Sequence, residues 1–194
     1  MGYCIAMYTL ASYATGGLGM SQTQAAALQS LLAAGFLVGR PLTGMLLDVG
    51  GRINVAIILN ILAGASCLAL WLPSRSFALV AVFALVQGCT GGSVWVAAAP
   101  VTAEMVGTAR SGSALAMFWM LVAPSAAFSS PSAIGLLNYA RHRLHKDGAE
   151  AYAISIGFSG GLFVLSSICL CGAKLYQLRM TREHKARQQV QEAA

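Results

Sequence analysis

An arginine within a long uncharged segment is the residue of this sequence best suited to bind a ligand. No charged residue precedes Arg40, and the next one, Asp48, lies about 12 Å further along if the segment is an α-helix. A charge inside an apolar helix is costly and commonly marks a pathway or a binding site. The planar guanidinium group of arginine binds a carboxylate through two hydrogen bonds. Arg40 therefore either faces a polar cavity or a bound organic anion, or is a structural arginine that pairs with backbone carbonyls or reaches the interface.

Charged residues of alternating sign mark two predicted turns. Asp48 and Arg52 flank the first turn, and Glu104 and Arg110 flank the second. If both turns lie at the cytoplasmic face, the four charges could hold one of two conformations and release in the other. Exposed ion pairs contribute only about 0–1 kcal/mol each, so the alternative is a set of loop charges that merely orients the helices. The predicted lock consists of Gly44, Asp48, Gly51, Arg52, Glu104 and Arg110.

Membrane-spanning helices must position these residues. Hydrophobic residues make up 57% of the chain and charged residues 9%, whereas a soluble domain carries roughly 25% charged residues. The charge-free runs are about 20 residues long or longer and lack the alternation of a membrane β-barrel strand. We predict an all-α integral membrane protein with six transmembrane helices in one bundle. The helices are expected at about 1–18 (marginal in length), 22–48, 53–73, 77–107, 112–140 and 151–174, followed by a basic cytoplasmic tail over 175–194.

The distribution of basic residues predicts the orientation in the membrane. With both termini cytoplasmic, the cytoplasmic side carries more Lys and Arg than the other side, as the positive-inside rule requires. The net charge of +6 is therefore a topology signal and an attraction to anionic lipid, and it indicates no nucleic-acid partner. The tail is expected to be a helix that continues into the cytosol or lies on the membrane.

The remaining reactive residues indicate packing rather than chemistry. All five cysteines fall in apolar runs, and no paired acids, histidine cluster or activated nucleophile occurs, so we predict no enzyme, no metal and no cofactor. Glycine pairs four residues apart, which let membrane helices approach closely, occur at 35/39, 88/92 and 157/161. Proline is expected to kink the helices at Pro100, Pro124 and Pro131.

Two motifs resemble a known family. Gly44-x-x-x-Asp48-x-x-Gly51-Arg52 resembles the loop signature of the major facilitator superfamily, although Val49 stands where that signature has a basic residue. Glu104 and Arg110 resemble the acid/base pair of the corresponding later turn. Gly39-Arg40-Pro41-Leu42 and Pro100-Val101-Thr102-Ala103-Glu104 are similar to stretches of fungal monocarboxylate-transporter-like permeases, in their C-terminal six-helix half.

The resemblance implies half of a twelve-helix secondary transporter that works by alternating access. Its substrate would be a small organic anion such as a monocarboxylate, contacted by Arg40. Phe36 stands where animal relatives have an aspartate, which leaves proton coupling and symport open. The predicted helpers in substrate binding are Asn60, Gln87, Trp95 and Trp119.

The expected partners are the lipid bilayer and either an N-terminal six-helix half or a second copy of the chain. The expected location is the plasma membrane or an internal, vacuolar membrane. The alternative function is that of a truncated, non-transporting membrane protein with a regulatory or assembly role.

Overall fold

The described part of the chain, residues 2–144 and 148–192 of a computed structural model, is helical and contains no strand. The long apolar runs form helices because a helix satisfies every backbone polar group within its own segment. The helices are α1 (Gly2–Ser12), α2 (Gln22–Gly50), α3 (Arg52–Ser66), α4 (Phe77–Gly91), α5 (Ser93–Val106), α6 (Ser111–Ala127), α7 (Ser129–Leu144) and α8 (Ala149–Glu192). The predicted all-α class is confirmed.

Five helical units of the described residues are long and apolar enough to cross a membrane. They are Gln22–Gly50, Arg52–Trp71, Phe77–Val106, Thr108–Arg143 and Ala149–Tyr176. The π-helical turn Tyr13–Gly17 lengthens α1, but the resulting unit stays below the roughly 20 residues of a membrane span. The first helix is thus short in the structure, as the sequence led us to expect.

Two segments predicted as continuous helices are interrupted. The segment predicted over 77–107 breaks at Gly92, between α4 and α5, and the segment predicted over 112–140 breaks at Phe128, between α6 and α7. Pro131 explains the second break, because it has no N–H group and its ring would clash with the carbonyl four residues earlier. The first break lies away from Pro100, at a glycine against which the Phe36 ring of α2 packs.

Glycine brings α2 and α4 into backbone contact. A Cβ atom added at Gly39 would lie 2.5 Å from the Cα of Cys89, and one added at Gly35 would lie 2.7 Å from the carbonyl oxygen of Leu85. The Cys89 thiol also donates to the carbonyl oxygen of Gly35 at 3.3 Å. By contrast, Cβ atoms at 157 and 161 would meet nothing within 4 Å. Close approach at glycine pairs is confirmed for 35/39 and 88/92 and is wrong for 157/161.

The hydrophobic core is larger at one end of the bundle than at the other. Tyr13, Trp71, Phe83 and Tyr152 pack together near the turns that join α1 to α2 and α3 to α4. Tyr13 completes this end by donating from its hydroxyl to the carbonyl oxygen of Ser74 at 2.5 Å. A smaller cluster lies toward the opposite end, which holds the turn between α2 and α3 and is called the α2–α3 end below; it contains Leu47, Val55, Ala56, Leu59 and Ala97.

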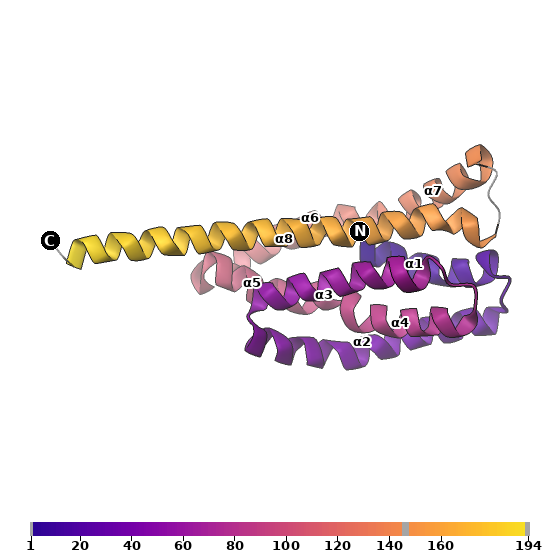
Figure 1. Cartoon of the computed structure of the whole chain (residues 1–194), viewed down its shortest axis with the longest axis horizontal. Coiled ribbons are helices and arrows are strands. Elements are labelled where there is room, and N and C mark those ends of the chain that lie inside the picture. The colour runs from indigo at the N-terminus through magenta and orange to yellow at the C-terminus, as the bar shows by residue number, and fades with distance from the viewer. Residues whose placement is uncertain (1, 145–147, 193–194) are drawn as a thin grey trace.

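The last helix is the longest element of the bundle. α8 has 44 residues, about 66 Å at the usual rise, and it packs along α3 before running past the α2–α3 end (Figure 1). Through residue 192, the predicted tail continues this helix, as the sequence led us to expect. The turn between α5 and α6 lies toward the same end (Figure 1).

Candidate functional site

One face of α2 carries polar and small side chains and is turned away from α4. A capping box sets the start of the helix: the Ser21 N–H donates to Oε1 of Gln24 at 3.1 Å, and the Gln24 N–H donates to Oγ of Ser21 at 3.3 Å. From this start, Gln22, Gln29 and Phe36 follow at intervals of seven residues, and Arg40 comes one turn later. Seven residues are close to two helical turns, so these side chains share one stripe.

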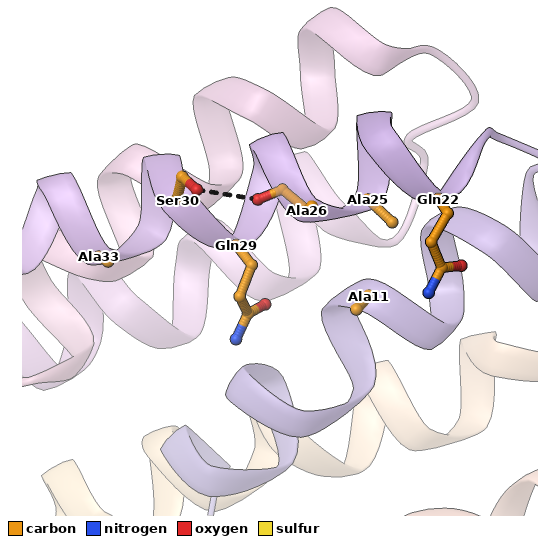
Figure 2. A pocket seen from close by; sticks show the side chains of 7 residues that line it. All are labelled: Ala11, Gln22, Ala25, Ala26, Gln29, Ser30 and Ala33. Atoms are coloured by element: carbon orange, nitrogen blue, oxygen red, sulfur yellow. Dashed lines mark hydrogen bonds between the residues drawn. The ribbon is translucent and has the colours of Figure 1, made fainter.

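A pocket of about 520 Å³ lies along the first half of this stripe, beside α1. Figure 2 shows Gln22 and Gln29 extending from α2 toward the side on which Ala11 of α1 lies. The remaining lining residues are Ala25, Ala26, Ser30 and Ala33. The alanine side chains are small and apolar, so the polar groups of the pocket are the two amides and the Ser30 hydroxyl.

Gln29 is the most constrained polar residue of the pocket. Its Nε2 donates to the carbonyl oxygen of Met7 at 3.2 Å, which ties α2 to α1. Its Oε1 is buried and has no hydrogen-bond partner among the described residues. An unsatisfied buried amide oxygen is costly, and it is an acceptor ready for a donor group.

Arg40 lies further along the same stripe and is exposed. Its guanidinium carbon is 5.4 Å from the centre of the Phe36 ring. The Phe36 ring in turn meets Tyr3 edge to face at 5.3 Å between ring centres. No carboxylate of the described residues lies within ion-pair distance of Arg40. The positive charge is therefore held over an aromatic ring and is available to an anion.

The predicted helpers of Arg40 lie at three different places. Trp95 and Trp119 stack on each other, with 5.1 Å between ring centres and 24° between planes. Asn60 lines a separate cavity of about 280 Å³ between α3, α5, α6 and α8, and its Nδ2 donates to the carbonyl oxygen of Ala56 at 2.8 Å. The structure thus pairs the two tryptophans and brings no described atom of Asn60 into contact with Arg40.

Gln87 is inside the bundle and fully buried. Ser66 of α3 donates from its hydroxyl to Oε1 of Gln87 at 3.0 Å, whereas Nε2 of Gln87 has no partner among the described residues. In this conformation Gln87 joins α3 to α4 and lines none of the pockets described here. Its role as a substrate contact would require a different packing of these helices.

The predicted charge lock is not formed in this conformation. Among the described residues, the single ion pair joins Arg75 to Glu150 at 3.7 Å, at the end opposite the α2–α3 end. Asp48, Glu104 and Arg110 are exposed. Arg52 instead donates from Nη1 to the carbonyl oxygen of Pro100 at 3.3 Å. The reason is geometric: Arg52 begins α3 and points at α5, so it reaches a backbone oxygen rather than a carboxylate.

Glycine shapes the turn at this end. Gly51 has a φ of 79°, a conformation in which a side chain is strained, and it separates α2 from α3. A Cβ atom at Gly44 would meet nothing within 4 Å. Among the described residues, the face of α2 at Gly44 is therefore open.

Sequence reasoning missed Gln22, Gln29 and Ser30. The signal was present in the sequence: the two glutamines are spaced by seven residues and share the helical register of Phe36, one turn before Arg40. The spacing alone does not assign them to a pocket, because amides in membrane helices more often join one helix to another.

Comparison with known proteins identifies relatives over most of the chain. A sequence model of the Major Facilitator Superfamily matches residues 1–193. The chain is similar to the probable transporter MCH2 of Saccharomyces cerevisiae, with 28% identity over 123 residues, 63% of this chain and 26% of that protein. It is similar to the uncharacterized transporter ESBP6 of the same yeast, with 29% identity over 178 residues, 92% of this chain and 25% of that protein.

A third relative comes from another fungus. The chain is 36% identical to the MFS-type transporter opdF of Penicillium oxalicum over 76 residues, 39% of this chain and 18% of that protein. The chain thus spans about a quarter of the length of the first two relatives. All three names describe transporters, in agreement with the prediction that the chain is not an enzyme. No solved structure matches the chain.

Proposed function

Because the chain belongs to the Major Facilitator Superfamily, we propose that it forms one six-helix half of a secondary transporter for small organic anions. The transporter works by alternating access: the substrate site opens first to one side of the membrane and then to the other. The open face of α2, from Gln22 to Arg40, faces the substrate path. The partner that completes the path is an N-terminal six-helix half or a second copy of this chain.

The main support for this function is the exposed, unpaired position of Arg40 among the described residues. Its guanidinium group is exposed on a membrane-spanning helix, lies over Phe36, and has no acidic partner among the described residues. A cation on such a segment is costly unless it faces water or an anion. A carboxylate fits the donor geometry of arginine through two parallel hydrogen bonds.

The polar groups upstream of Arg40 support the same path. Gln22 and Gln29 lie on the same stripe of α2 and line a pocket, with Ser30 at its edge, and Oε1 of Gln29 has no donor among the described residues. Gln29 and Arg40 are about 16 Å apart along α2, so a small hydroxy acid would meet them in turn: its carboxylate oxygens suit Arg40, and its hydroxyl donor suits Gln29. The stacked Trp95 and Trp119 form a hydrophobic wall of the path in its substrate-bound state, with Asn60 and Gln87 as further contacts.

Uptake into proteoliposomes tests this function directly. The protein, expressed from its complete coding sequence, is reconstituted and assayed with radiolabelled acetate, lactate, succinate and glucose. Saturable uptake of at least one carboxylate, with no uptake of glucose, is expected. Uptake of glucose and of no carboxylate would overturn the assignment of an anionic substrate.

A second function rests on the open face of α2. α1 lies against that face at Gln29 and Phe36. Further along, Arg40 is exposed and a Cβ atom at Gly44 would meet nothing within 4 Å, so this second half of the face is also suited to bind another membrane protein without transport. Cross-linking in native membranes distinguishes the two functions. A second copy or a six-helix half cross-linked to the α2 face, together with carboxylate uptake, supports the transporter. A cross-link to an unrelated protein and no uptake of any anion support the regulatory or assembly role.

A further inference from the structure

A groove of about 670 Å³ separates the start of α3 from the second half of α8. It lies on a different side of α3 from the cavity that contains Asn60, it includes no residue of the α2 stripe, and it touches the turn between Asp48 and Arg52 through Gly50 alone. Its walls combine one cation, one amide and apolar side chains. The residues that matter here are Asn54, Ile57, Ile58, Lys174, Leu175 and Leu178.

Lys174 supplies the charge of the groove. Its side chain is half-buried, and its Nζ donates to Oδ1 of Asn54 across the two helices. No carboxylate of the described residues lies within ion-pair distance of Nζ. An ammonium group has three donors, and Asn54 accepts from one of them. The remaining donors point to an anionic ligand with oxygen acceptors.

The position of Lys174 along α8 indicates the depth of that ligand. The charge-free run of α8 ends at Ala173, and Lys174 is the first of the basic residues that follow it, so Lys174 lies where the apolar stretch of the sequence ends. Ile57 and Ile58 follow Asn54 by about one turn, and Cys171 precedes Lys174 by one turn, so the apolar wall lies about 5 Å deeper than the charge. A polar group at the interface with an apolar wall below it matches a phospholipid, whereas inorganic phosphate would leave the wall uncovered.

The rest of α8 strengthens the attraction to an anionic surface. The helix runs past the bundle at this end (Figure 1). Its sequence after Lys174 contains Arg179, Arg182, Lys185 and Arg187. Basic residues next to a membrane segment attract anionic lipid headgroups. The four basic residues that follow the groove in the sequence outnumber the one acid between them, Glu183, and so raise the local concentration of such lipids.

We infer that the groove between α3 and α8 binds an anionic phospholipid. Its phosphate accepts hydrogen bonds from Lys174 beside Asn54, and one acyl chain lies over Ile57 and Ile58. The bound lipid ties α8 to the start of α3, next to the turn between α2 and α3. This site does not depend on whether the protein transports an anion.

Lipid binding to the purified, delipidated protein tests the inference. Native mass spectrometry measures the occupancy of phosphatidylserine and of phosphatidylcholine with matched acyl chains. The unchanged protein is expected to prefer phosphatidylserine, and Lys174→Gln is expected to lower its affinity for that lipid about fivefold. Arg179→Gln is the matched control, because Arg179 is an exposed cation of the same helix outside the groove, and it is expected to keep most of the affinity.

Two further measurements separate binding in the groove from binding elsewhere on the protein. Ile58→Trp fills the groove while leaving the charge, and it is expected to displace the lipid even if Lys174→Gln fails to fold. Inorganic phosphate at the same concentration is expected not to compete. The inference is overturned if Lys174→Gln and Arg179→Gln lose affinity for phosphatidylserine equally, which would indicate a general attraction to the tail. It is also overturned if Ile58→Trp binds the lipid like the unchanged protein, or if inorganic phosphate displaces the lipid.

Discussion

Replacing Gly39 by alanine tests the contact that holds the proposed anion-binding helix in place. The added Cβ atom would lie 2.5 Å from the Cα of Cys89, whereas ordinary contacts of this kind begin at 3.4 Å. Neither atom can move independently, because the Cβ atom is bonded directly to the backbone of α2 and the Cα atom is part of the backbone of α4. The two helices must therefore separate by about 1 Å, which weakens dispersion contacts along the whole α2–α4 interface.

The cost can be estimated from the behaviour of overpacked cores. Overpacking by one methyl group costs about 1–3 kcal/mol, and a protein of this size loses about 2–4 °C per kcal/mol, so the melting midpoint should fall by roughly 2–12 °C. Tryptophan fluorescence of the purified protein in detergent measures the midpoint, since Trp71 lies in the buried core. Gly88→Ala should behave similarly, because its Cβ atom would collide with backbone atoms of Leu32 and Gly35.

Gly161→Ala is the matched control for this experiment. It lies in a helix, it belongs to the same kind of glycine pair, and its Cβ atom would meet nothing within 4 Å. Alanine is the better helix former, so the control should melt at the same temperature or slightly higher. If Gly39→Ala and Gly161→Ala have the same melting midpoint, the close backbone contact between α2 and α4 at Gly39 is refuted.

Three further substitutions test individual contacts. Gly92→Ala should lower the melting midpoint, because the new methyl group collides with the Phe36 ring. Adding Phe36→Leu should recover part of that loss, whereas a double variant whose midpoint falls by the sum of the two single losses would contradict this contact. Arg52→Gln should raise amide hydrogen exchange at the end of α5 roughly fivefold by removing the bond to Pro100, and unchanged exchange would show that the bond contributes nothing. Gln87→Leu removes the bond from Ser66 but also the buried Nε2, which has no partner among the described residues, and the Ser66 hydroxyl keeps the carbonyl oxygen of Ala63 as an acceptor. The midpoint should therefore change little, and a fall of more than about 5 °C would mean that Nε2 is satisfied.

The positions of the long helical runs were predictable because charge is excluded from the membrane interior, although five of the six predicted helices are matched by described units long enough to cross a membrane. Each charge-free run had to form a helix, and the breaker residues between runs had to form turns. The break at Gly92 was not predictable in the same way. It depends on the packing of Phe36 from another helix, and no local pattern around Gly92 encodes that contact.

The candidate site was predictable only where a residue is costly in a membrane. Arg40 stood out because a charge in an apolar helix needs an explanation, and the structure leaves it exposed without a described acidic partner. Gln87 and Asn60 could not be assigned to a cavity from the sequence. These helices are apolar on all sides, so periodicity does not distinguish the interior from the path. The charge lock stays a prediction, because it need form in only one of two conformations; in the present one Arg52 donates to the carbonyl oxygen of Pro100, an acceptor that spacing alone does not choose.

The most direct test of the central claim is the uptake of a carboxylate by variants of Arg40. Proteoliposomes containing the unchanged protein, Arg40→Lys, Arg40→Ala and the loop control Arg75→Ala are compared at equal protein content. Loss of a charged hydrogen-bonding partner should raise the half-saturation concentration about 10- to 100-fold for Arg40→Ala and less for Arg40→Lys, with Arg75→Ala unchanged. Half-saturation concentrations that are the same for Arg40→Ala and the unchanged protein, for every transported anion, would contradict the role of Arg40 in binding.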